Sequence, residues 1–308
     1  MREGGGLEIA TILDEILSEG GYEIVNAFIN SSPWARPGRH IVPRGGVIHW
    51  TGNIGRGANA WANRNYFDSL RDNYASAHTV GDDTTILAAL PCLNEEVEMA
   101  YHVGAASYRT SYFGAYPNAS TLGHEMCVNA DGNFRESYKR AVWVMANWCF
   151  QFGWDADSAV MRHYDVTGKP CPLPFTDVVH DNRHCAALGF TEAQTAWIRD
   201  HLHIDGLLGE ALWRAYKSDV ADLTVILREG GLTMLQQLVQ KMEELQARNS
   251  ELENRFNQLE KALYLSQIPD WAADSVQCAV QKGLIDTPEG GSYDFYRTLT
   301  ILHRNGTL

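Results

Sequence analysis

The feature that most constrains this chain is a heptad repeat towards its end. Two series of mostly apolar residues recur every seven positions, one at Leu235, Met242, Asn249, Phe256 and Leu263, the other at Leu238, Leu245, Leu252 and Leu259. They supply the a and d positions of about four heptads, which predicts a coiled coil over residues 233–265. Leucine at each d position, with Asn249 at an a position, favours a parallel homodimer. The alternative is a helix packed on its own domain.

The charges beside this seam agree with parallel pairing. Arg248 at a g position would face Glu253 at an e position of the partner chain, and Arg255 would face Glu260 in the same way. Such g-to-e pairs set the orientation of two-stranded coiled coils.

Composition narrows the function classes. The 308 residues are 45% hydrophobic and 20% charged, which is typical of a globular protein. The net charge of −13 argues against passive binding to nucleic acid or to a membrane surface. No stretch approaches the length of an apolar membrane span. The six cysteines lack CxxC pairs, as in a protein made in a reducing compartment, and the N-terminal residues lack a secretory signal pattern.

The pattern of elements predicts an α/β domain with a central mixed β-sheet flanked by helices. Strands are expected at 46–50, 77–80, 85–90 and 122–128, and helices at 7–17, 58–71 and 134–150. Residues 191–229 have a helical pattern, and we expect glycines to interrupt it at Gly206, Gly209 and Gly230-Gly231.

The most informative chemical segment runs from Arg162 to Pro172. His163 and Cys171 can ligate one zinc ion if the loop between them turns back, and Gly168 with the two prolines supplies that turn. His49, near the end of an apolar strand, is the best candidate for a third ligand. Three protein ligands would leave one position open for water, as in catalytic zinc sites.

Several motifs in order carry a resemblance to a known family. They are Pro33-Trp34-Ala35-Arg36-Pro37-Gly38, Val47-Ile48-His49-Trp50-Thr51-Gly52-Asn53, Ala77-His78, Tyr101-His102-Val103-Gly104, Leu122 to Asn129, and His163 to Pro174. This set, over residues 30–180, resembles the zinc N-acetylmuramoyl-L-alanine amidases of phage endolysins and bacterial autolysins. Their fold is shared with peptidoglycan recognition proteins.

The resemblance implies a set of roles. The Zn²⁺ ligands would be His49, His163 and Cys171, one ion per catalytic domain. Glu125 would act as the general acid and base, and Lys169 would stabilise the oxyanion. These roles suit zinc hydrolysis, in which water is activated at neutral pH and negative charge develops on the carbonyl oxygen.

Other positions are open to two interpretations. His78 and His102 either line the substrate groove or are satisfied polar residues beneath the sheet. Some relatives carry a catalytic tyrosine just before the histidine equivalent to His78, whereas this chain has Ala77. The departure places acid–base work on Glu125. His124 precedes Glu125 on a strand and is expected to point to the opposite face.

The function that the resemblance implies is hydrolysis of the amide between the lactyl group of N-acetylmuramic acid and L-alanine of the peptidoglycan stem peptide. A phage or prophage endolysin fits a protein made in the cytoplasm without a signal peptide that acts at the cell wall after release. The alternatives are a bacterial autolysin, a non-catalytic peptidoglycan-binding module and a recycling amidase. A recycling enzyme has no need of a coiled coil or a wall-binding unit.

The last segment resembles an S-layer homology repeat, which would bind a secondary cell-wall polymer. Its usual Thr-Arg-Ala-Glu signature is degraded to Tyr296-Arg297-Thr298-Leu299, so it is alternatively a cap for the coiled coil. Trp271, Tyr293 and Arg297 are expected to be core and capping residues rather than ligands. The predicted organisation is a catalytic domain at 1–190, a helical connector at 191–232, the coiled coil at 233–265 and this small helical unit at 266–308.

Overall fold

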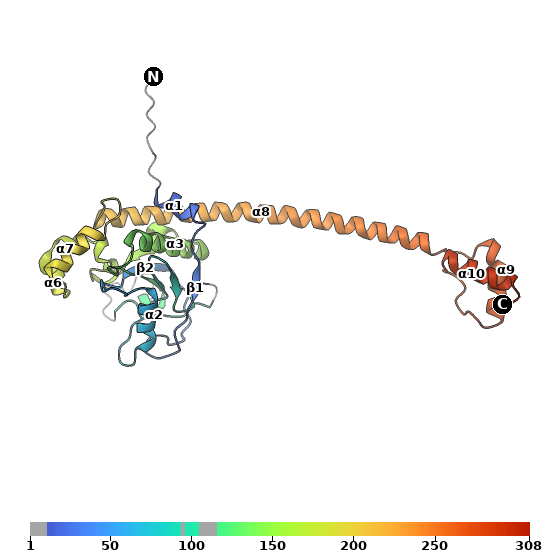
Figure 1. The fold of residues 1–308 in the computed structure, drawn as a ribbon, viewed down its shortest axis with the longest axis horizontal. Helices are drawn as coiled ribbons and strands as arrows, with labels where there is room; N and C mark the ends of the chain where they lie inside the picture. Colours follow the sequence, from blue (N-terminus) through green and yellow to red (C-terminus); the bar gives the residue numbers. More distant parts are fainter. Residues whose placement is uncertain (1–10, 94–95, 105–115) are drawn as a thin grey trace, which may run out of the picture. The chain divides into compact units, whose positions relative to one another are not determined.

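The computed structural model describes residues 11–93, 96–104 and 116–308. The chain divides into two compact units, with the boundary between Gly231 and Leu232. The first unit is built on one six-stranded sheet (Figure 1). Its strands are β1 (Ile24–Asn26), β2 (Gly45–Trp50), β3 (Thr79–Gly81), β4 (Ile86–Ala88), β5 (Thr121–Met126) and β6 (Val160–Arg162).

The sheet is mixed, in the order β1-β4-β3-β5-β2-β6. Only β3 and β4 are antiparallel neighbours, and every other described pair is parallel. The Asp82 carboxylate accepts hydrogen bonds from the backbone N–H groups of Thr84 and Thr85, which closes the tight turn between β3 and β4. The predicted fold class and the predicted strand-turn-strand are both confirmed.

One face of the sheet is covered by α3 (Phe134–Phe152). Alternate residues of β2, Ile48 and Trp50, point towards this face and join the same apolar core as Trp148. Gly46 belongs to this face as well. A Cβ at Gly46 would lie 2.3 Å from Met145 Sδ, so the glycine allows the helix to approach the strand closely.

The opposite face is only partly covered. The helix α2 (Ala60–Ser69) packs on β3 and β4 through a core that includes Phe67, Val80 and Leu87. The Asn59 side chain caps its first turn by accepting a hydrogen bond from the backbone N–H of Ala62. The helix α2 contacts β3 and β4, so the carboxyl ends of β2 and β5 lie beside the part of the face that it covers.

The rest of the first unit is helical. It contains α1 (Ile12–Ser18), η2 (Pro117–Ala119), α4 (Ala156–Ala159), α5 (His163–Thr167), η3 (Leu173–Phe175), η4 (Asp177–His180), α6 (Asn182–Ala187), α7 (Glu192–His201) and the start of α8 (Glu210–Leu263). The start of the helix predicted at 7–17 lies outside the described residues.

Residues after 190 pack as part of the first unit, where the sequence predicted a connector. Ile198 of α7 and Leu212, Tyr216 and Val220 of α8 are fully buried in the core that α3 forms with the sheet. The break predicted at Gly230-Gly231 is wrong, since α8 continues through both glycines. A glycine weakens a helix by about 1 kcal/mol, which good helix formers on both sides can offset.

The second unit contains the remainder of α8, η5 (Asp270–Ala272), α9 (Ala273–Gln281) and α10 (Tyr293–Arg304). Its small core contains Val276, Tyr296 and Leu299. Of the predicted core and capping residues, Trp271 and Tyr293 lie outside the core, because their side chains are 44% and 55% exposed and lie side by side on the surface.

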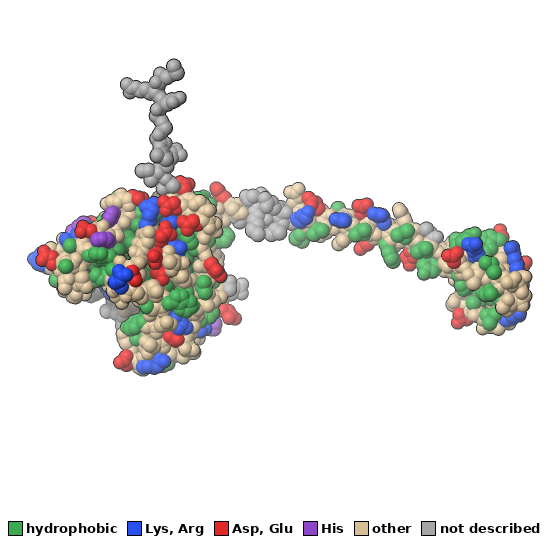
Figure 2. All heavy atoms as spheres, viewed as in Figure 1, with side chains coloured by type: hydrophobic (Ala, Val, Ile, Leu, Met, Phe, Trp, Pro, Cys, Tyr) green, Lys and Arg blue, Asp and Glu red, His purple; other side chains and the backbone are tan. Residues whose placement is uncertain are grey.

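Apolar side chains stand exposed along the α8 residues of this unit (Figure 2). The apolar side chains described at predicted a and d positions are 52% to 67% exposed. They are Met242, Leu245, Leu252, Phe256, Leu259 and Leu263. In the part of the chain that the structure describes, no helix is both long and apolar enough to cross a membrane.

Candidate metal centre

Three side chains converge at the carboxyl ends of β2 and β6. His49 lies near the end of β2, His163 follows β6 as the first residue of α5, and Cys171 lies on the loop beyond. Their ligand atoms are all within 4.8 Å of one another, and all three residues are buried. Nδ1 of His49 lies 3.1 Å from Nδ1 of His163 and 3.7 Å from Sγ of Cys171. The structure thus brings the predicted zinc ligands together.

The loop between His163 and Cys171 turns back as the sequence suggested. Gly168 ends α5 with a φ of 79°, a left-handed conformation that favours glycine. The backbone N–H of Tyr164 then donates to the carbonyl of Cys171 at 3.0 Å. This hydrogen bond holds the two ends of the loop beside each other.

Arg162 anchors this loop, and sequence reasoning missed it. Its guanidinium is almost fully buried and forms an ion pair with Asp165 inside α5 and another with Glu210 at the start of α8. It also donates to the carbonyl of Phe175 at 2.6 Å. A buried charge needs such partners. An arginine directly before a predicted ligand and after the apolar pair Val160-Met161 was the available signal.

The electrostatics of the three donors suit a metal cation. Burial lowers the pKa of His163 to about 3 and lowers that of His49 well below its ordinary value, so both imidazoles are neutral. Burial also raises the pKa of the Cys171 thiol to about 12. Binding a cation would therefore release the thiol proton, as thiolate ligands require.

Two of the three distances between the donors also match those in a zinc site. Tetrahedral coordination, with Zn–N near 2.0–2.1 Å and Zn–S near 2.3 Å, places two nitrogen ligands roughly 3.3 Å apart and a nitrogen and a sulfur roughly 3.6 Å apart. The donor pairs of His49 with His163 and with Cys171 lie at 3.1 and 3.7 Å. Two imidazoles and one thiol form a buried nitrogen–sulfur donor set. Zinc binds such donors, whereas calcium and magnesium prefer oxygen ligands.

Glu125 lies next to this donor set. On the neighbouring strand β5 it pairs in register with His49, so both side chains point to the same face of the sheet. Its Oε2 atom is buried without a hydrogen-bond partner among the described residues. Burial raises the pKa of Glu125 to about 8, although the nearby Lys169 ammonium opposes the shift. A buried carboxyl with a raised pKa and no structural partner is typical of a catalytic acid or base.

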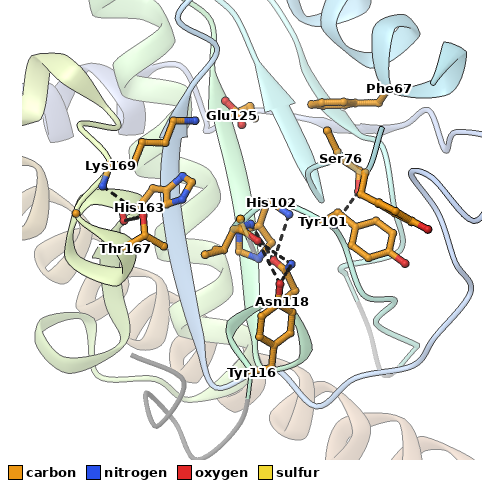
Figure 3. A pocket seen from close by; sticks show the side chains of 15 residues that line it. Phe67, Ser76, Tyr101, His102, Tyr116, Asn118, Glu125, His163, Thr167 and Lys169 are labelled. Carbon is orange, nitrogen blue, oxygen red and sulfur yellow. Dashed lines mark hydrogen bonds between the residues drawn. The ribbon is translucent and has the colours of Figure 1, made fainter. Parts of the chain in front are cut away.

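Glu125, His163 and Lys169 all line one cavity of about 920 Å³ (Figure 3). The Lys169 side chain extends from the loop towards Glu125. The same cavity is also lined by four aromatic side chains, those of Phe67, Tyr74, Tyr101 and Tyr116. Cavities that combine apolar or aromatic walls with a few polar groups are typical of ligand-binding sites.

The other histidines occupy different positions. His102 is buried and lines the cavity. Both ring nitrogens of His78 are bonded to backbone groups, the carbonyl of Glu98 and the N–H of Gly123, and His78 is not among the residues that line the cavity. His124 points to the opposite face, as expected, and bonds Thr79. Residue 77 is a fully buried alanine, so this position offers no hydroxyl group of the kind that a tyrosine would supply.

Fold and site together describe an α/β domain whose mixed sheet carries a buried His-His-Cys donor set beside a carboxyl with one unpartnered buried oxygen. Residues 38–174, less than half of the chain, match the family described as N-acetylmuramoyl-L-alanine amidase. All three donors and Glu125 lie within this segment.

Curated relatives agree with this match. The chain is 35% identical over 159 residues to a protein of Bacillus licheniformis named probable N-acetylmuramoyl-L-alanine amidase, covering 50% of this chain and 43% of that protein. It is 35% identical over 161 residues to the N-acetylmuramoyl-L-alanine amidase BlyA of Bacillus subtilis strain 168, covering 49% and 42%. The chain thus spans less than half the length of these relatives.

The chain is also similar to a solved structure. The catalytic domain of XlyA aligns with 54% of this chain and 99% of its own length, at 27% identity and a TM-score of 0.43.

Proposed function

We propose that this protein is a zinc-dependent N-acetylmuramoyl-L-alanine amidase that hydrolyses the amide between the lactyl group of N-acetylmuramic acid and L-alanine of the stem peptide. The observation that carries the proposal is the unpartnered Glu125 carboxyl beside the His49, His163 and Cys171 donor set. The match of residues 38–174 to the amidase family supports the choice of substrate.

The residues divide the reaction between them. When bound, zinc acts as a Lewis acid that polarises the amide carbonyl and makes water nucleophilic at neutral pH. Glu125 accepts the proton of the attacking water and delivers it to the alanine nitrogen as the C–N bond breaks. Lys169 faces the negative charge that develops on the carbonyl oxygen. The products are a free lactyl carboxylate and a free alanine amine.

The experiment that tests this activity measures the new ends released from purified cell walls. New N-terminal alanine should appear without new reducing sugar ends, and chelation should abolish the release until zinc is added back. Glu125→Gln protein should bind walls without releasing ends. New reducing ends, or full activity in metal-free protein, would contradict the proposal. Wall binding by wild-type protein with no release would favour a non-catalytic binding module.

We propose further that α8 forms a parallel homodimeric coiled coil over residues 233–265. The exposed apolar side chains at Leu245, Leu252 and Leu259 support this, because a contiguous row of exposed leucines is typical of a surface that binds another chain. Arg248 and Arg255 stand at g positions and complement the glutamates at e positions of a parallel partner.

The unit at 266–308 is proposed to target the enzyme to the wall by binding a secondary polymer. Its exposed Trp271 and Tyr293 form an aromatic surface pair, a common device for contacting sugar rings. A phage or prophage endolysin, released to the wall at lysis, is the setting that best suits such a protein, and a bacterial autolysin is the alternative.

A further inference from the structure

We infer that His102 is a positioning residue, which fixes the tautomer of the metal ligand His49 through a chain of hydrogen bonds that ends on the chain just before β5. The inference rests on the proposed zinc function. Nothing in the sequence distinguishes this role from a place in the substrate groove, since both put a histidine near the metal.

The far end of the chain decides where the protons lie. The Thr121 hydroxyl lies 2.6 Å from the carbonyl of Pro117, which can only accept, so the hydroxyl donates its one proton there. Nε2 of His102 lies 3.2 Å from that hydroxyl oxygen and 3.2 Å from the backbone carbonyl of Thr121. Both atoms facing Nε2 are therefore acceptors, so Nε2 of His102 must carry a proton.

The tautomer of His102 then fixes that of His49. A neutral imidazole has one N–H, so Nδ1 of His102 is an acceptor. It lies 2.9 Å from Nε2 of His49, which must donate to it. The Nδ1 lone pair of His49 is thereby left free, and this is the atom that faces His163 and Cys171. Metal-bound histidines are commonly oriented by such a hydrogen bond from the second ring nitrogen.

The surroundings hold the His102 ring in this place. A Cβ at Gly123 would lie 2.6 Å from Cγ of His102, so β5 leaves room for the ring only because this residue is glycine. Asn118 fixes the backbone on the other side. Its side-chain oxygen accepts from the N–H groups of His102 and Val103 at 3.2 and 2.8 Å, and its amide donates to the carbonyl of Val103 at 2.9 Å (Figure 3).

His78 provides a matched comparison within the same molecule. It is equally buried and its ring centroid lies 5.6 Å from that of His102. Both of its ring nitrogens form hydrogen bonds with the backbone, at Glu98 and Gly123, rather than with a proposed metal ligand. Loss of His78 should disturb packing as much as loss of His102, without changing the tautomer of His49.

The test compares zinc affinity in shape-matched variants of the full chain. Asparagine and leucine have similar branching, but only asparagine offers an acceptor near the position of Nδ1. We expect His102→Leu to bind zinc about 10- to 100-fold more weakly in competition with a chelator, the usual effect of losing such a partner. His102→Asn should restore most of the affinity, and His78→Leu should retain wild-type affinity.

Each result separates the possibilities. Wild-type affinity in a folded His102→Leu protein would overturn the inference, and a change in KM alone would assign His102 to the substrate groove instead. Wild-type protein that binds no zinc would overturn the proposed function as well. A measurement without mutation covers the case of a variant that does not fold. The ¹⁵N chemical shifts of the metal-free wild type should place the protons of His49 and His102 on Nε2, and a proton on Nδ1 of His49 would refute the chain.

Discussion

The proposed catalytic carboxyl of Glu125 carries a cost to stability. Burial raises the pKa of its carboxyl from 4.5 to about 8, so the folded metal-free protein holds a proton that the unfolded chain releases. A folded-state pKa above the unfolded value favours folding at low pH, and this contribution is lost as the pH rises from about 4.5 to 8. The buried Glu125 carboxyl therefore lowers the stability of the metal-free fold at neutral and higher pH.

Replacing this carboxyl should reveal the conflict. We expect metal-free Glu125→Gln to melt at a higher temperature than wild type, with a difference that widens between pH 5 and pH 8. The widening is at most about 1.4 kcal/mol per pH unit, because one proton is involved. Thermal melts at several pH values measure it, with Asp72→Asn, an exposed carboxyl, as control. A constant difference across this range would mean that Glu125 ionises normally in the fold.

Lys169 should matter for turnover and not for metal binding. It stands on the exposed rim of the cavity and extends towards Glu125 (Figure 3). We expect Lys169→Met to keep zinc at wild-type stoichiometry and to lower kcat by ~10²-fold or more, the usual effect of losing an oxyanion-stabilising group. Zinc content and steady-state kinetics on soluble muropeptides check this. A kcat within a few-fold of wild type would remove Lys169 from the reaction.

At this scale the sequence predicted residues that belong to a motif and missed those that act through geometry. His49, His163 and Cys171 stand in an order and spacing that point to zinc before any fold is known. The work of Asn118 and Arg162 depends on which carbonyls and carboxylates the fold brings to them. Neither residue type has a spacing that reveals such partners.

Among the elements, β5 is the strand whose residues must suit both the core on one face of the sheet and the candidate site on the other. Its residues point alternately into the α3 core and into the site, so Leu122 and Met126 are apolar whereas Gly123 and Glu125 serve the cavity. Gly123 is required for space and not for backbone freedom, since no positive φ is recorded for it.

A methyl group at Gly123 should therefore be harmful out of proportion to its size. We expect Gly123→Ala to destabilise the protein by about 1–3 kcal/mol, the usual effect of overpacking, and to weaken zinc binding because the His102 ring must move. Denaturant melts and chelator competition measure the two effects. The control is Gly230→Ala within α8, where a Cβ meets nothing within 4 Å and should stabilise the helix. Unchanged zinc affinity in Gly123→Ala would show that the ring position is unimportant.

Strong local patterns predicted elements well, and weak ones did not. The apolar run 46–50 became β2 at Gly45–Trp50, and the helical spacing over 134–150 became α3 at Phe134–Phe152. The strands β1 and β6 have three residues each, too few to show an alternation, and they lack the tight turn that marked the equally short β3 and β4. At Gly230 the glycines predicted a break, but the helix-forming residues on both sides keep α8 continuous.

At the scale of the whole molecule, the two units have different kinds of sequence signal. The first unit extends to Gly231 because the apolar side chains of α7 and early α8 complete its core. The part of α8 in the second unit has no comparable cover within the described chain, and Leu245, Leu252, Leu259 and Leu263 are exposed. A heptad seam needs a partner, and a second copy of the same helix satisfies both its apolar positions and its charges.

The full-length protein should therefore be a dimer in solution, and a chain ending at Gly231 should be a monomer that still cleaves soluble muropeptides. Two joined tails would raise wall affinity well above that of one, because the second binding event becomes intramolecular. Light scattering and wall-binding isotherms measure both properties, and a full-length monomer at micromolar concentration would refute the coiled coil.

Asn249→Leu gives a finer test, because a buried asparagine lowers stability while limiting the assembly to two strands. This variant should melt at a higher temperature and form larger oligomers, whereas an unchanged oligomer and melting temperature would mean that Asn249 does not lie in the seam.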